Sequence, residues 1–161
     1  MRRTALVLAL AAALLPAAPQ AAPERPSSSA PSSIGADPAG LLGLGLPEAV
    51  GRLGLPESVY AVRGEEPWQD DVAFRYAEGF TLFLYDDRLW QLRFSAPYAD
   101  PVYGLYVGDA ADKAYSLMGE PYERGENELV YRMPYQGYPV RLRLDLKEGK
   151  LADIYLYRAD F

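Results

Sequence analysis

A helix-stopping pattern occurs twice in this chain, at positions 65 residues apart. In each copy an apolar-striped segment ends at a glycine, Gly54 or Gly119, and a proline follows two residues later. Glycine readily adopts the left-handed conformation that ends a helix, and proline cannot continue one. The pattern predicts two short amphipathic helices within Leu42–Pro56 and Val107–Glu120, with Asp109 as the N-cap of the second.

Segments rich in apolar and aromatic residues follow each predicted helix and alternate with polar residues, as half-buried strands do. The predicted strands are Val72–Tyr76, Phe80–Tyr85, Leu89–Phe94, Leu129–Met133, Tyr138–Leu146 and Leu151–Tyr157. Hairpin turns are expected at Asp86-Asp87-Arg88 and Lys147-Glu148-Gly149-Lys150, and Glu57–Asp71 is expected to be a long loop. The predicted fold class is α+β, with two tandem repeats of a helix plus a three-stranded antiparallel sheet, and with the helices packed on one sheet face.

The N-terminal residues have the pattern of an export signal. Arg2 and Arg3 precede an apolar run and then small residues, so residues 1–22 are predicted to be a cleavable signal peptide. Residues 23–35, rich in proline and serine, are expected to be a flexible linker before repeat 1 (36–96) and repeat 2 (97–161), which could together form one compact domain. The expected location is the periplasm or the extracellular space. Without cysteine the chain has no residue for a lipid anchor or a disulfide.

The composition excludes several classes of function. Acidic residues outnumber basic ones by 22 to 16, and loss of the leader would change the formal charge from −6 to −8, so nucleic acid is not an expected partner. The absence of histidine and cysteine removes the usual zinc ligands and the commonest catalytic bases and nucleophiles. Asp70-Asp71 and Asp86-Asp87 are interpreted as turn or surface carboxylates and not as a catalytic pair. No cofactor, metal or enzymatic activity is therefore predicted.

The order of elements resembles a known architecture. A glycine, a short helix, a Leu/Met-Gly-x-Pro stop at Gly54 and Gly119, and then tyrosine-containing strands ending in a hairpin resemble the SmpA/OmlA (BamE) outer-membrane assembly family. Two such units in tandem resemble the β-lactamase inhibitor protein. The resemblance covers Ala36–Tyr157 and implies a non-catalytic protein-binding fold. This chain lacks the lipid-bearing cysteine of the first family and the disulfide cysteines of the second.

Strand alternation sorts the side chains into two faces. A fully apolar set that includes Trp90 is expected under the helices, and the opposite face carries arginines and aromatic residues, which are enriched at protein interfaces. The predicted partner-binding residues are Trp68, Phe83, Tyr85, Arg93, Arg141, Arg143, Tyr155 and Tyr157. The alternative is that this face is merely a solvated sheet surface stabilised by cross-strand pairs.

These observations predict an exported, non-catalytic protein-binding module of the bacterial cell envelope that uses the outer face of its sheet. A protein of the envelope or of the extracellular space is the expected partner. The first alternative is an envelope or outer-membrane assembly or structural factor. The second and weaker alternative is an enzyme that processes an envelope polymer.

Overall fold

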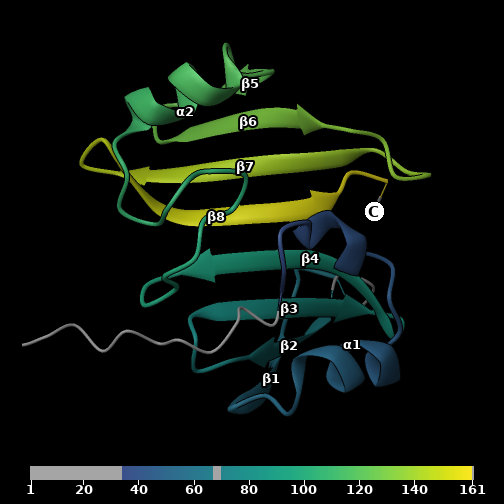
Figure 1. Ribbon diagram of the computed structural model, residues 1–161. Coiled ribbons are helices and arrows are strands. Elements are labelled where there is room, and N and C mark those ends of the chain that lie inside the picture. The colour runs from purple at the N-terminus through teal and green to yellow at the C-terminus, as the bar shows by residue number, and fades with distance from the viewer. Residues whose placement is uncertain (1–33, 67–69, 161) are drawn as a thin grey trace, which may run out of the picture. The chain divides into compact units, whose positions relative to one another are not determined.

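The computed structural model describes residues 34–66 and 70–160. In chain order its elements are η1 (Pro38–Leu41), α1 (Leu46–Leu53), β1 (Ser58–Val62), β2 (Asp71–Arg75), β3 (Phe80–Tyr85), β4 (Arg88–Ser95), α2 (Ala111–Met118), β5 (Glu123–Arg124), β6 (Glu128–Met133), β7 (Val140–Lys147) and β8 (Lys150–Arg158). The strands of this described part form one antiparallel sheet in the order β1-β2-β3-β4-β8-β7-β6-β5 (Figure 1). The signal peptide and most of the linker predicted from the sequence lie outside the described residues.

The expectation of two tandem helix-plus-three-stranded repeats is wrong. Each α-helix is followed by four strands, and all eight strands join one sheet, so the described chain is mostly β. The additional strands are β1, which begins the segment Glu57–Asp71 expected to be a loop, and β5, which is two residues long. The other six strands lie within two residues of their predicted ranges.

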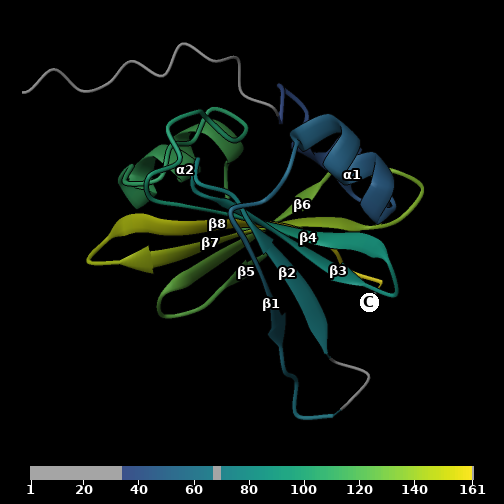
Figure 2. The same cartoon turned by 90° about the horizontal axis from the view of Figure 1, so that it is seen from below.

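Both α-helices pack on one face of the sheet (Figure 2). Because strand side chains alternate between faces, every second residue of each strand points toward these helices. One row of directly paired residues crosses the sheet on this side: Phe74, Leu82, Leu92, Leu156, Leu142 and Tyr131. The four leucines of this row are at most 1% exposed. Burial of one such side chain contributes about 1.5–3 kcal/mol, so this face holds the core.

The two predicted hairpin turns are confirmed. Asp86 and Asp87 join β3 to β4 with φ angles of 47° and 58°, and Glu148 and Gly149 join β7 to β8 with φ angles of 54° and 73°. Positive φ at both central residues is the type I′ geometry, whose twist matches that of the flanking strands. These turns set the register of the two hairpins.

A β-bulge between Phe83 and Leu84 changes which residue of β4 enters the core. Leu84 pairs with Leu89, which is fully buried, and the next residue, Trp90, is the inserted one. The Trp90 indole N–H donates to Oδ1 of Asp71 at 2.9 Å. The expectation that Trp90 belongs to the core set is therefore wrong, because strict alternation does not anticipate an inserted residue.

The two α-helices end at the predicted glycines, but α2 does not begin as predicted. Its N-cap is Ala110, which makes no side-chain cap bond. Asp109 instead accepts hydrogen bonds from the Tyr106 N–H and from Nζ of Lys113, both at 2.7 Å. Burial opposes ionisation of Asp109, but these two bonds outweigh it and lower the pKa of the carboxyl. The aspartate therefore links the segment before the helix to the Lys113 side chain of the first turn, without capping a backbone N–H of the helix.

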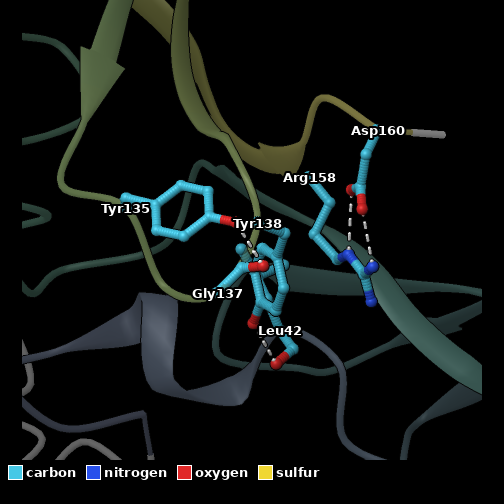
Figure 3. Close-up of polar contacts among 6 residues, drawn as sticks. All are labelled: Leu42, Tyr135, Gly137, Tyr138, Arg158 and Asp160. Carbon is cyan, nitrogen blue, oxygen red and sulfur yellow. Dashed lines mark hydrogen bonds and ion pairs between the residues drawn. The ribbon is translucent and has the colours of Figure 1, made fainter.

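A polar cluster ties the segment before α1 to the C-terminal strands (Figure 3). The Tyr138 hydroxyl donates to the carbonyl of Leu42 at 2.7 Å, across 96 positions of sequence. The Arg158 Cζ atom lies 4.1 Å from the centre of the Tyr138 ring, and its guanidinium pairs with Asp160 at 2.9 Å. These contacts fix the segment that leads into α1 against the far end of β8.

Among the helices of residues 34–66 and 70–160, none combines the length and the apolar character needed to cross a membrane.

Candidate binding face of the sheet

The sheet face opposite the helices, called the open face here, is built by two rows of paired residues. Antiparallel pairing brings directly opposite side chains within contact distance, so each row is a ladder of neighbours. The first row reads Arg75, Thr81, Arg93, Tyr155, Arg143 and Val130. The second row reads Tyr60, Ala73, Phe83, Gln91, Tyr157, Arg141 and Arg132.

Tyr155 lies at the centre of the first row between two arginines. The Cζ atoms of Arg143 and Arg93 lie 4.2 Å and 5.7 Å from the centre of its ring. Such cation–π contacts contribute about 0.5–1 kcal/mol at exposed sites and more where water is excluded. Burial, the largest cause, raises the pKa of the Tyr155 hydroxyl, so this ring stays neutral at physiological pH.

Both arginines of this row are also paired with carboxylates. Arg93 Nη2 lies 2.9 Å from Oδ1 of Asp153, and Arg143 Nε lies 3.0 Å from Oδ1 of Asp145. Burial raises the pKa of the Asp145 carboxyl, the Arg143 guanidinium opposes this rise, and the nearby Asp153 carboxylate adds to it. At the centre of the open face, each of the two arginines beside the Tyr155 ring is therefore paired with a neighbouring aspartate.

Arg132 and Arg141 at the end of the second row are not compensated in this way. They are directly opposite each other on β6 and β7. Their Cζ atoms lie 3.6 Å and 5.3 Å from the centre of the Tyr122 ring, which is 48% exposed. In the described part of the chain, neither arginine forms an ion pair with a carboxylate. Arg141 Nη1 donates to its own strand's Val140 carbonyl at 3.2 Å.

The structure brings five of the predicted partner-binding residues together on the middle strands. Arg93, Tyr155 and Arg143 are consecutive in the first row, and Tyr157 and Arg141 are consecutive in the second. These five are half-buried.

The three other predicted residues have different surroundings. Phe83 is on the open face but only 8% exposed, so its ring packs against neighbouring side chains and offers a partner little contact area. Tyr85 lies at the end of β3 opposite Arg88, next to the hairpin turn. Trp68 lies outside the described residues.

Sequence reasoning missed Tyr122 and did not include Arg132 among the binding residues. Tyr122 precedes β5, and nothing in the spacing of a two-residue strand predicts where its ring lies. Alternation from its buried neighbour Tyr131 places Arg132 on the open face. Its lack of a carboxylate partner becomes visible only when the strand register is known.

Two depressions are also present, and the second includes Asp145 of the open face. One of about 330 Å³ lies on the helix side and is lined by apolar side chains of α1, β2 and β3 together with Asp70, Asp86 and Asp87. The other, of about 390 Å³, is lined by residues 125–128, Asp145 and Leu146. Among the described residues, no group of three or more acidic, histidine or cysteine side chains is arranged to hold a metal ion.

Comparisons with known proteins add information on the fold. No family model and no curated protein matches this chain. A solved structure of an extracellular protein containing an SCP domain from Bacillus anthracis is similar over 91% of this chain and 51% of that chain, with a TM-score of 0.52 and 8% identity. A cysteine-rich secretory protein from Staphylococcus aureus is similar over 75% of this chain and 46% of that chain, with a TM-score of 0.48 and 8% identity.

This chain thus spans about half the length of the solved chains that it matches. At 8% identity the first likeness concerns the fold alone. The resemblance to the SmpA/OmlA (BamE) family and to the β-lactamase inhibitor protein is wrong: the fold is similar to that of an extracellular protein containing an SCP domain, and the described elements form one eight-stranded sheet. A pattern of helix stops is too general to identify a family, because any short helix before a strand can end in this way.

Proposed function

We propose that this chain is an exported binding module that recognises acidic side chains of a protein partner through the Arg132–Arg141 end of the open face. Export is supported by the signal pattern of residues 1–22 and by the description of the first structural neighbour as an extracellular protein. The binding role is supported by the charges of the open face.

The observation that carries this proposal is the unequal pairing of the arginines of the open face. Arg75, Arg93 and Arg143 each have a carboxylate partner at 3.6 Å or less. Arg132 and Arg141 have none among the described residues and lie directly opposite each other, where like charges destabilise a sheet.

The geometry of the pair suits a carboxylate. A guanidinium presents donors in a planar fork that matches a carboxylate with two parallel hydrogen bonds. The Tyr122 ring lies beside both guanidinium groups, Arg132 is exposed, and Arg141 is half-buried with one of its donors bonded to the Val140 carbonyl. Tyrosine and arginine are the residue types that contribute most to protein interfaces. A glutamate or aspartate side chain of the partner would therefore pair with Arg132 and Arg141, as Asp153 and Asp145 already pair with the two arginines beside Tyr155.

The test compares two labelled peptides, one of alternating glutamate and serine and one in which glutamine replaces glutamate. Fluorescence anisotropy at low and high salt measures their dissociation constants. The glutamate peptide is expected to bind more tightly, and its affinity should fall as salt screens the charges. Arg132→Gln and Arg141→Gln should each weaken it by about tenfold, since each removes one charge-assisted contact.

Arg52→Gln is the matched control, because it removes the same charge from the last turn of α1 on the helix side of the sheet. Its affinity should equal that of the wild type. Equal binding of both peptides, or equal loss in all three variants, would exclude the assigned site. Arginine-dependent binding of polygalacturonate without binding of the peptide would show that the partner class is wrong. Partners captured from envelope extract and culture medium can then be ranked by their sensitivity to Arg141→Gln.

A further inference from the structure

The depression of about 330 Å³ on the helix side of the sheet combines an apolar wall with carboxylates. Its apolar wall is formed by Leu46 of α1, Val72 and Phe74 of β2, and Leu84 of β3. Its carboxylates are Asp70, just before β2, and the β3–β4 turn residues Asp86 and Asp87. We call this site the acidic depression.

An exposed apolar surface continues from the acidic depression to the edge of the sheet. Val72 is 43% exposed. Val59 of the edge strand β1 is 53% exposed and lies directly opposite Phe74, so it belongs to the same face (Figure 1). Contiguous exposed apolar area of this kind marks binding surfaces.

The other type I′ hairpin shows that the fold does not need an apolar residue at the position of Val72. Val72 pairs with Leu84, which lies two residues before the β3–β4 turn. Leu146 lies two residues before the β7–β8 turn, and its N–H donates to the carbonyl of Asn127 at 2.7 Å. Asn127 therefore lies beside Leu146 as Val72 lies beside Leu84, and Asn127 is polar and exposed. The valine contributes apolar area that this position does not require for folding.

The carboxylates determine which charge an occupant needs. Asp70 pairs with Arg63, but in the described part of the chain neither Asp86 nor Asp87 forms an ion pair. An apolar wall beside unpaired carboxylates matches a side chain with an apolar stem and a cationic end. Lysine and arginine are the side chains of this kind. The apolar surface at Val59 and Val72 extends beyond the depression, so it also matches apolar residues next to that cation.

We propose that the acidic depression binds a lysine or arginine of a partner protein whose neighbouring residues are apolar. The stem of the basic side chain packs against Leu46 and Phe74, and its cationic end pairs with Asp86 and Asp87. The apolar neighbours cover Val59 and Val72. This site lies on the helix side of the sheet and does not depend on the function proposed for the open face.

The experiment measures fluorescence anisotropy of labelled peptides with the full chain. The first peptide carries one lysine flanked by valines between glycine–serine ends. The second has norleucine in place of lysine, which keeps the stem and removes the charge, and the third has serines in place of the valines. The lysine–valine peptide should bind about tenfold more tightly than either, because each replacement removes one part of the match. Its affinity should fall with salt.

Asparagine substitutions test the carboxylates without disturbing the turn. Asp86 and Asp87 have positive φ angles, and asparagine is favoured at such positions of a type I′ turn. Asp86→Asn and Asp87→Asn should each weaken the lysine–valine peptide by about threefold, and the double variant by about tenfold. Glu148→Gln is the matched control, because it removes the same charge from the other type I′ turn, where φ is 54°. Its affinity should equal that of the wild type.

Circular dichroism and thermal unfolding establish that each variant is folded. Arg141→Gln should bind the lysine–valine peptide as the wild type does, so this proposal and the one for the open face can fail separately. Equal affinity for the lysine and norleucine peptides would overturn the proposal, and so would a double asparagine variant that binds as the wild type does. Hexylamine binding as tightly as the peptide would show that the occupant is a small amine. Dimerisation in sedimentation velocity that the lysine–valine peptide abolishes would show that a second copy fills the site, and would also overturn the proposal.

Discussion

At the scale of single residues, the Tyr138 hydroxyl has a role that can be separated from its ring. It donates to the carbonyl of Leu42, and the ring also lies against Arg158 (Figure 3). Burial raises the pKa of this hydroxyl, with Arg158 opposing the rise, so the group remains a neutral donor. A phenylalanine would keep the ring contact and lose only the hydrogen bond.

Tyr138→Phe is expected to lower the free energy of unfolding by about 1 kcal/mol, because the Leu42 carbonyl loses a partly buried donor. Urea unfolding followed by circular dichroism measures this change. Tyr135→Phe is the matched control: Tyr135 is 72% exposed and bonds only to the nearby Gly137 carbonyl, at 2.7 Å. Equal effects of the two substitutions would show that the Leu42 contact adds no stability.

At the scale of elements, the turn between β2 and β3 needs a glycine for two reasons. Gly79 has a φ angle of 94°, and its carbonyl accepts from the Ser95 N–H at 2.9 Å. A Cβ atom at this position would lie 2.6 Å from the carbonyl oxygen of Ser95 and would also meet the backbone nitrogen of Tyr98. The turn therefore packs directly against the segment after β4.

Gly79→Ala should destabilise the fold by about 3 kcal/mol, because it combines positive-φ strain with a clash against backbone that cannot move freely. Thermal and urea unfolding measure the loss. Gly137→Ala separates the two causes: Gly137 has a φ angle of 84° but no atom within 4 Å of the added Cβ. Its expected cost is only the strain, about 1–2 kcal/mol. A Gly79→Ala cost no larger than that of Gly137→Ala would contradict the packing argument.

At the scale of the whole described chain, pairing of β4 with β8 joins the two halves. Five consecutive residue pairs form this ladder, from Gln91 with Tyr157 to Ser95 with Asp153. Leu156, which is fully buried, is opposite Leu92 in β4 and Leu142 in β7. Because one core extends across the joint, the sheet should unfold as one cooperative unit.

Leu156→Ala should therefore lower stability by about 2–5 kcal/mol and shift the unfolding of the whole sheet together. Circular dichroism and tryptophan fluorescence should report a single, coincident transition in wild type and variant. Leu117→Ala, at a leucine of α2 that is 54% exposed, is the control and should change stability by less than about 0.5 kcal/mol. Two separate transitions would show that the halves are independent units.

Much of the local structure could be predicted from the sequence. The two helix stops, the two type I′ turns and six strands depend on nearby residues, such as Gly54, Gly119 and Asp86-Asp87, whose conformational preferences are intrinsic. Alternation also assigned Arg93, Arg143 and Tyr155 to one face correctly. Their role in binding a partner stays a prediction until the peptide and variant measurements are made.

The sequence by itself thus determined where the chain turns, where its helices end and which side chains most strands bury. Only the tertiary structure decided that β1 and β5 complete one sheet, that a bulge sends Leu89 to the core instead of Trp90, and that Arg132 and Arg141 meet without a carboxylate partner. The physical reason is range. Turns and caps depend on a few adjacent residues, whereas strand partners, bulges and charge pairing depend on side chains that are distant in the chain and become neighbours only on folding.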